Sequence, residues 1–112
     1  MKCKKTAIAI ATFVLVTFHA VCQNPEQLAD EAAKAYNSMH FDQAIKLYGK
    51  IIDNGYESAA LYYNLGNAYF RNDENAQAVL YYEKALKLSP NNSDIRHNIE
   101  VVNNRLTDKV ET

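Results

Sequence analysis

The fold of this chain is decided by one stretch of 34 residues, AALYYNLGNAYFRNDENAQAVLYYEKALKLSPNN, which runs from residue 59 to residue 92. In its first half, Tyr62, Leu65, Gly66 and Tyr69 recur at intervals of three or four residues. This spacing places the four side chains on one face of an α-helix. The first half of the stretch is therefore predicted to be an amphipathic helix.

The second half of the stretch carries a matching face, made of Ala78, Tyr82 and Ala85. Small residues stand where two packed helices would approach most closely, and aromatic residues stand beside them. A glycine in the middle of a helix costs about 1 kcal/mol relative to alanine. Gly66 therefore indicates close packing, and the stretch predicts a helical hairpin.

A weaker copy of the pattern lies 34 residues earlier, where residues 44–48 (AIKLY) align with residues 78–82 (AVLYY). A period of this length is typical of stacked helical repeats. We expect repeat 1 at about residues 25–58, repeat 2 at residues 59–92 and one capping helix at residues 93–107. Residues 108–112 are expected to form a frayed tail.

Capping residues set the expected helix ends. Asn24 should cap the first helix, with a proline at its first turn, and Gly55 should stop the second. Asn75 or Asp73 is predicted to cap the fourth helix, and Ser93 the fifth. The expected helices cover about residues 25–38, 41–53, 58–72, 75–88 and 94–107.

Residues 1–22 have the pattern of an export signal. Three lysines among the first five residues precede an uncharged run at residues 6–18, which is shorter than the roughly 20 residues of a membrane-spanning helix. Cleavage is expected before Gln23, which would place the mature protein in the periplasm. Two alternatives remain open: Cys22 carries a lipid, or the segment is kept as an anchor. Only in these two cases do we expect contact with a membrane.

Composition excludes several kinds of site. From residue 23 onward, the chain has 9 lysines and arginines, 13 aspartates and glutamates, and no cysteine. A disulfide framework or zinc site is therefore not expected, and a mildly acidic chain gives no reason to expect nucleic acid as a partner. We find no motif for a cofactor or for catalysis, and carboxylates such as Glu26 fit the first turn of a helix.

These residues resemble the tetratricopeptide repeat family. Residues 59–92 match its pattern at eight positions, with two departures: Asp73 replaces the usual turn glycine, and Asn75 replaces the usual aromatic residue. The resemblance implies an all-α fold of helix-turn-helix hairpins in a short right-handed solenoid, covering residues 23–107. It also implies a non-catalytic scaffold that binds other proteins.

A narrower likeness is to the repeat part of BatE-type proteins of the Bacteroides aerotolerance group. It rests on the export signal, on YYNLGNAY at residues 62–69 and on the sequence near residues 98–111. This resemblance implies a cell-envelope role linked to oxygen tolerance. Proteins of this group continue into membrane-spanning and further small domains, whereas this sequence ends at Thr112, so a short relative and a truncated one remain alternatives.

The partner is expected on the concave face, which the first helices of successive repeats line. Asparagine amides can bond a peptide backbone, aromatic rings offer apolar area, and arginine can bind a carboxylate. The expected binding residues are Tyr63, Asn64, Asn67, Phe70 and Arg71, with Tyr36 and Asn37 on one side and His97, Asn98 and Arg105 on the other.

Alternative readings of this face remain open. Tyr63 and Phe70 would also suit packing against the adjacent helix, and Arg71 and Arg105 would suit solvated charges. The clamp for chaperone tails known in this family is not expected, because Ala29 and its neighbours lack the required polar groups.

Self-association is the alternative function, because so short a stack is near the minimum of about three repeats. We expect apolar residues at its ends to be exposed and to allow a homo-oligomer: Leu28, Val101, Val102 and Leu106.

Overall fold

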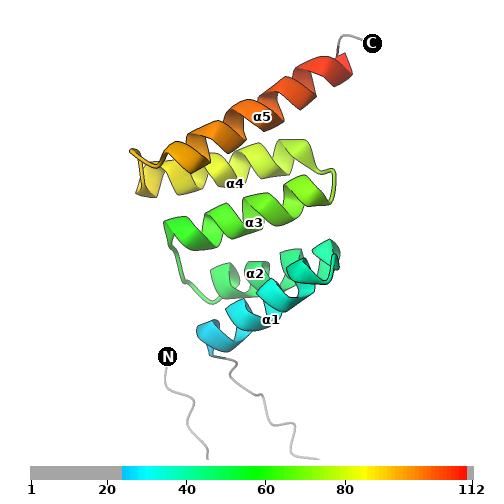
Figure 1. Ribbon diagram of the computed structural model, residues 1–112. Helices are drawn as coiled ribbons and strands as arrows, with labels where there is room; N and C mark the ends of the chain where they lie inside the picture. Colours follow the sequence, from blue (N-terminus) through cyan, green and yellow to red (C-terminus); the bar gives the residue numbers. More distant parts are fainter. Residues whose placement is uncertain (1–23, 111–112) are drawn as a thin grey trace, which may run out of the picture.

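The computed structural model describes residues 24–110, and these form five helices without a strand (Figure 1). They are α1 (Pro25–Asn37), α2 (Phe41–Asp53), α3 (Ala59–Arg71), α4 (Asn75–Leu88) and α5 (Ser93–Val110). The predicted all-helical fold is confirmed. The predicted signal at residues 1–22 lies outside the described residues. α5 continues three residues beyond the end expected at Thr107.

Consecutive helices pack in pairs, α1 with α2 and α3 with α4, and α5 lies along α4. Because each helix reverses the direction of the one before, α1, α3 and α5 all run the same way in Figure 1.

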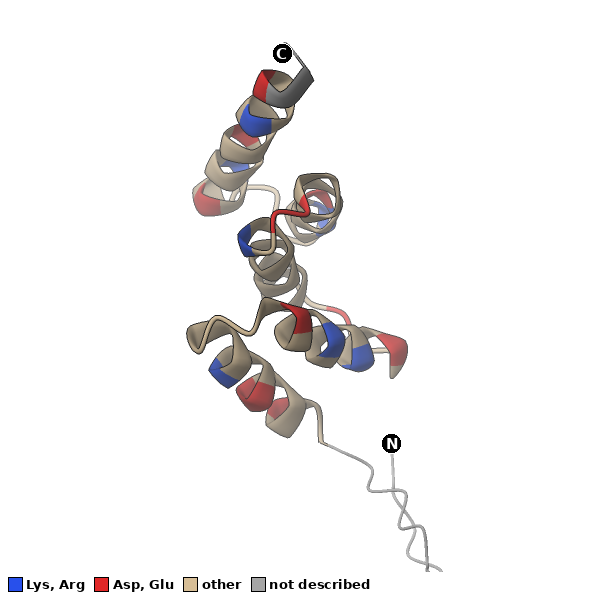
Figure 2. Ribbon diagram, turned by 90° about the vertical axis from the view of Figure 1, so that its right-hand side faces the viewer, with Lys and Arg blue, Asp and Glu red and all other residues tan. Residues whose placement is uncertain are grey.

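Acidic and basic residues are interspersed along the helices (Figure 2). Within the described part of the chain, no helix is long and apolar enough to span a bilayer.

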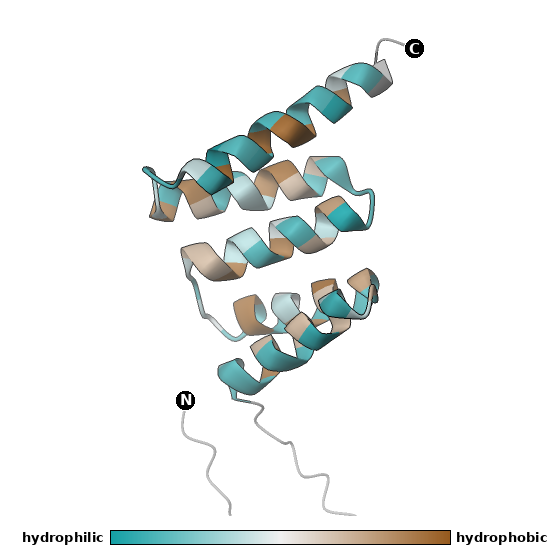
Figure 3. Cartoon of the chain, in the orientation of Figure 1, coloured by the Kyte–Doolittle hydropathy of each residue, from teal (hydrophilic) through white to brown (hydrophobic). Residues whose placement is uncertain are grey.

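The core consists of two buried clusters. The first joins α1, α2 and α3 and includes Leu28, Leu47 and Leu65. The second joins α3, α4 and α5 and includes Tyr82 and Ile95. The remaining surface of α5 is mostly hydrophilic (Figure 3), as a helix that ends a stack requires.

The prediction of apolar helical ends is wrong for two residues. Leu28 and Val102 are each only 1% exposed, because α2 covers the first and α4 covers the second. Val101 and Leu106 are half-buried. Leu28 and Val102 are therefore not available for self-association through the ends of the stack. Among the described residues, the large apolar side chains that are exposed are Met39, Tyr56, Leu80 and Leu88.

Two predicted helix ends are confirmed. The Asn24 side chain accepts a hydrogen bond from the Glu26 amide at 2.9 Å and caps α1. Gly55 has a φ of +90° after α2, and the Tyr56 amide donates back to the Ile51 carbonyl. This is the left-handed helix stop that the sequence predicts.

Two predicted caps are wrong. Glu74 holds the N-cap position of α4 in place of Asp73 or Asn75: Asp73 lies in the turn with a φ of +61°, and Asn75 is the buried first residue of the helix. Ser93 is the first residue of α5 rather than its cap. Asn92 caps that helix instead, since its side-chain oxygen accepts from the Asp94 and Ile95 amides at 3.0 and 3.2 Å.

Candidate functional site

Close packing of α3 on α4 shapes the concave face. A Cβ atom at Gly66 would lie 2.7 Å from two ring carbons of Tyr82, so the ring occupies the space that a side chain would need. Tyr82 is thereby only 1% exposed. Its ring passes beside α3, and its hydroxyl emerges on the side of α3 that faces α5. Gly66, which the sequence predicts to be a point of close packing, therefore lies where α3 meets α4.

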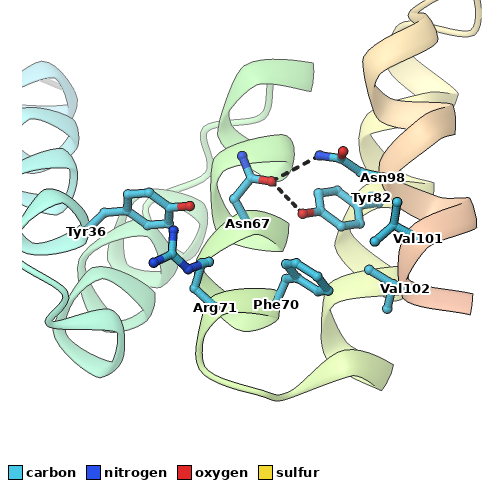
Figure 4. Close-up of a pocket in the computed structure, with 8 residues that line it drawn as sticks. All are labelled: Tyr36, Asn67, Phe70, Arg71, Tyr82, Asn98, Val101 and Val102. Carbon is cyan, nitrogen blue, oxygen red and sulfur yellow. Dashed lines mark hydrogen bonds between the residues drawn. The ribbon is translucent and has the colours of Figure 1, made fainter. Parts of the chain in front are cut away.

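A hydrogen-bond network then ties three helices together (Figure 4). The Tyr82 hydroxyl donates to Asn67 Oδ1 at 2.5 Å, and Asn98 Nδ2 donates to the same oxygen at 3.3 Å. Asn98 Nδ2 also lies 3.1 Å from the Tyr63 hydroxyl. The amide nitrogen of Asn67 bonds to none of the described residues and points away from these bonds in Figure 4. Asn67 is therefore held by its oxygen while its two N–H groups remain available.

A groove of about 220 Å³ opens above this network. Such a volume is below the 300–1,000 Å³ of typical small-molecule sites and suits one side chain of a larger partner. We call it the α3–α5 groove. Its lining residues are Tyr36, Asn67, Phe70, Arg71, Tyr82, Asn98, Val101 and Val102.

A second groove lies beside the first. It runs between α1 and α3, and we call it the α1–α3 groove. Tyr36 and Asn67 line both grooves, so the two are adjacent across the first helices of the stack. The other lining residues of the α1–α3 groove are Ala33, Asn37, Tyr48 and Asn64.

Aromatic rings hold the two arginines of this face. The guanidinium carbon of Arg71 lies 5.0 Å from the centre of the Phe41 ring and 5.9 Å from that of Tyr36. The guanidinium carbon of Arg105 lies 4.4 Å from the centre of the Phe70 ring. A cation over the face of a ring within about 6 Å is attracted by the ring quadrupole. Both arginines are exposed to solvent, but contact with the rings fixes where their guanidinium groups lie.

Most of the predicted binding residues come together. Tyr36, Asn67, Phe70, Arg71 and Asn98 line the α3–α5 groove, and Asn37 and Asn64 line the α1–α3 groove. Tyr63 and Arg105 contact lining residues without lining either groove themselves. His97 is exposed and lines neither groove.

Two tyrosines of the site were not predicted from the sequence. Tyr82 was assigned to hairpin packing alone, although its hydroxyl also anchors Asn67. Tyr48 forms part of the α1–α3 groove. The repeat pattern needs only an aromatic ring at such a position, and this chain has tyrosine there. Because a buried tyrosine hydroxyl requires a hydrogen-bond partner, the residue type itself indicates a polar contact. Tyr63, in turn, fits the packing alternative, since its ring centre lies 5.8 Å from that of Tyr82.

The site offers hydrogen bonds and apolar contacts rather than proton transfer. Burial raises the pKa of Tyr82, and the nearby Tyr63 adds to the effect. Burial also raises the pKa of Tyr48. Both phenols therefore stay protonated at neutral pH. Among the described residues, no cluster of histidine, cysteine, aspartate or glutamate could hold a metal ion.

Comparison with known proteins agrees with this architecture. Residues 59–92, which form α3, α4 and the turn after them, match the family model of the tetratricopeptide repeat. No curated protein matches the chain at a significant level. The chain thus contains a tetratricopeptide repeat, a unit that generally serves protein–protein interaction, and the grooves described above lie on the face formed by its first helix.

Proposed function

We propose, from the tetratricopeptide repeat at residues 59–92, that this chain is a scaffold that binds an extended segment of a partner protein in its two neighbouring grooves. The observation that carries the proposal is that the grooves lie next to each other across α1, α3 and α5, with Tyr36 and Asn67 lining both. An extended segment laid across three parallel helices would meet both grooves. A single small molecule would fill only one of them.

The polar groups in these grooves suit a peptide backbone, which offers one donor and one acceptor per residue. Asn64 and Asn37 are exposed, and Asn67 has a free amide nitrogen. The Asn37 and Asn64 side chains can each donate to a carbonyl and accept from an N–H group, whereas Asn67 can donate. Phe70 and Tyr36 add apolar area with few rotatable bonds to immobilise.

A pair of substitutions tests the proposal without disturbing the fold. Asn37→Ala combined with Asn64→Ala removes two exposed amides of the α1–α3 groove. The matched control is Gln77→Ala with Asn103→Ala, which removes two exposed amides outside both grooves. A partner captured by the parent chain from residue 23 onward should be lost by the first variant and retained by the second.

A photo-crosslinking amino acid gives an independent measurement. Placed at Asn64, it should form a covalent adduct with the same partner, whereas placed at Asn103 it should not. Capture that survives the Asn37→Ala and Asn64→Ala changes, together with crosslinks at both positions, would locate the partner elsewhere and reject the groove.

We also propose that the chain is exported and acts in the cell envelope, within an assembly of the aerotolerance type. The lysine-rich start, the uncharged run at residues 6–18 and the small residues before Gln23 support export. Mass spectrometry of the protein from its native host should find Gln23 at the N-terminus. A lipid on Cys22 would instead favour the lipoprotein alternative, and an unprocessed chain in the cytoplasm would reject export. Loss of oxygen tolerance on deletion of the gene would support the aerotolerance role.

A further inference from the structure

The two arginines of the concave face are not neutralised by carboxylates. Neither the Arg71 nor the Arg105 guanidinium forms an ion pair with a carboxylate of the described residues; each lies over an aromatic ring instead. The lining of the α3–α5 groove contains no acidic residue, and neither does that of the α1–α3 groove. The lack of acidic residues in these two linings contrasts with the chain from residue 23 onward, which has a net negative charge.

Two acidic residues lie in a hollow at the N-terminal ends of the first helices. This third hollow shares Asn64 with the α1–α3 groove and includes Glu26 and Glu57, which lie at the N-terminal ends of α1 and α3. Arg71 is the last residue of α3. Asp42 and Glu74 also lie near this end of α3, where their carboxylates accept from the Asn72 amide at 2.8 and 2.9 Å. Neither carboxylate lines the α3–α5 groove, so Arg71 is the charged residue of its lining.

The α3–α5 groove also has an apolar wall next to the cations. Phe70 is half-buried, and the Arg105 guanidinium lies over its ring. Val101 and Val102 complete this wall from α5. A ligand side chain that enters the groove would meet apolar surface, while the atoms on either side of it would meet a guanidinium.

We propose that the α3–α5 groove selects an acidic segment, in which a carboxylate side chain lies next to an apolar one. The apolar side chain enters between Phe70 and Val101, and the carboxylates accept hydrogen bonds from Arg71 and Arg105. Guanidinium groups that are already positioned over rings lose little conformational freedom on binding, and their planar donors match a carboxylate. This inference rests on the proposed function, because it names the chemistry of the partner segment.

Fluorescence anisotropy with defined peptide pools tests it. The probe is a labelled ten-residue pool in which aspartate or glutamate alternates with leucine or phenylalanine. The matched pool has asparagine or glutamine at every acidic position. The parent chain from residue 23 onward should bind the acidic pool at least about 10-fold more tightly than the amide pool, and the difference should shrink as salt screens the charges.

Substitutions then assign the preference to the two arginines. R71Q and R105Q should each weaken binding of the acidic pool about 10-fold or more, the scale of a hydrogen bond to a charged group. The matched control is K84Q: Lys84 also lies over two rings, at 5.7 Å from Tyr62 and 5.2 Å from Tyr81, but on α4 outside the groove. It should leave binding unchanged. Circular dichroism would verify that all three variants remain helical.

The outcomes separate this inference from the function on which it rests. Equal binding of the two pools, or a double R71Q and R105Q variant that binds the acidic pool like the parent, would overturn the acidic preference. Either result would leave the groove as a peptide site if Asn37→Ala with Asn64→Ala still abolished capture of the partner. The proposed function fails only if that capture is unchanged.

Discussion

Gly66 allows α3 and α4 to close because its side chain is a single hydrogen atom. The neighbouring Tyr82 ring cannot easily move away, since it is buried and its hydroxyl is bonded to Asn67. Packing, a hydrogen bond and the floor of the α3–α5 groove therefore depend on the same ring.

Replacement of Gly66 by alanine should lower the free energy of unfolding by about 1–3 kcal/mol, because the added methyl group overpacks the contact with Tyr82. The matched control is Gly49→Ala in α2. A Cβ at Gly49 would meet nothing within 4 Å, so this change should instead stabilise the helix by about 0.5–1 kcal/mol. Urea unfolding of both variants measures the difference. If both substitutions stabilise the protein, the Gly66 contact is not tight.

Asn75 is a second residue whose environment makes a clear prediction. It is 4% exposed, and neither its amide nitrogen nor its oxygen has a hydrogen-bond partner among the described residues. A buried polar group without a partner costs about 1–3 kcal/mol. Asn75→Leu, which is similar in size, should therefore raise the free energy of unfolding by about 1 kcal/mol or more, whereas the ionised Asn75→Asp should lower it. Thermal unfolding at neutral pH checks both, and a destabilised leucine variant would show that the amide is bonded in solution.

At the scale of the helices, the stops after α1 and α3 are less favourable than the one after α2. Gly55 ends α2 with a φ of +90°, but Met39 and Asp73 occupy the equivalent left-handed conformation with φ of +64° and +61°. A side chain in that conformation costs about 1–2 kcal/mol, which glycine avoids. Both turns are nevertheless retained because the next amide bonds back into the helix, as His40 does to the Ala35 carbonyl at 2.8 Å.

Met39→Gly should accordingly raise the free energy of unfolding by about 1 kcal/mol. The methionine is 68% exposed, so its removal sacrifices little packing. Gly55→Ala is the opposite change at the matching position and should cost a similar amount. Chemical denaturation of the two variants gives the comparison, and shifts of the same sign would mean that turn conformation does not limit stability here.

The helix ends also show what could be predicted from the sequence. The span of α2 and the stop at Gly55 followed from residue types that favour one conformation. The choice between Asn92 and Ser93 as the cap of α5 did not, because both residue types cap well and only backbone geometry separates them.

The candidate site was predictable to a similar degree. The repeat pattern places Asn64, Asn67 and Arg71 on the concave face, but it does not reveal which of their atoms are already bonded. The bond from Tyr82 to Asn67 joins residues 15 apart in sequence, and the one from Asn98 joins residues 31 apart. Such contacts depend on how whole helices dock, which local spacing does not describe.

At the scale of the molecule, the two core clusters are joined rather than separate. Ile52, Tyr69 and Tyr81 pack against both clusters. The rings of Tyr69 and Tyr81 are stacked, with centroids 5.4 Å apart and planes 11° from parallel. In a stack where each repeat contacts only its neighbours, such interfaces carry the coupling between units. Tyrosines thus contribute to both clusters and to the connection between them.

This reliance on tyrosine makes stability sensitive to alkali. Burial raises the pKa of Tyr82, Tyr69, Tyr62 and Tyr48 above their ordinary value. Below pH of about 10, the ordinary tyrosine pKa, both folded and unfolded chains keep these phenol protons, so the contribution to stability is constant. Above that pH the unfolded chain releases them while the folded chain retains them, and the free energy of unfolding must fall.

Tyr82→Phe should change that dependence in a specific way. At neutral pH the variant should be less stable by about 1 kcal/mol, because Asn67 loses its donor. Between pH 10 and 12 its stability should fall less steeply than that of the parent, since one of the buried phenols is gone. Urea unfolding at a series of pH values measures both slopes. Equal slopes for parent and variant would contradict the prediction, because they would mean that the Tyr82 phenol ionises as readily in the folded chain as in the unfolded one.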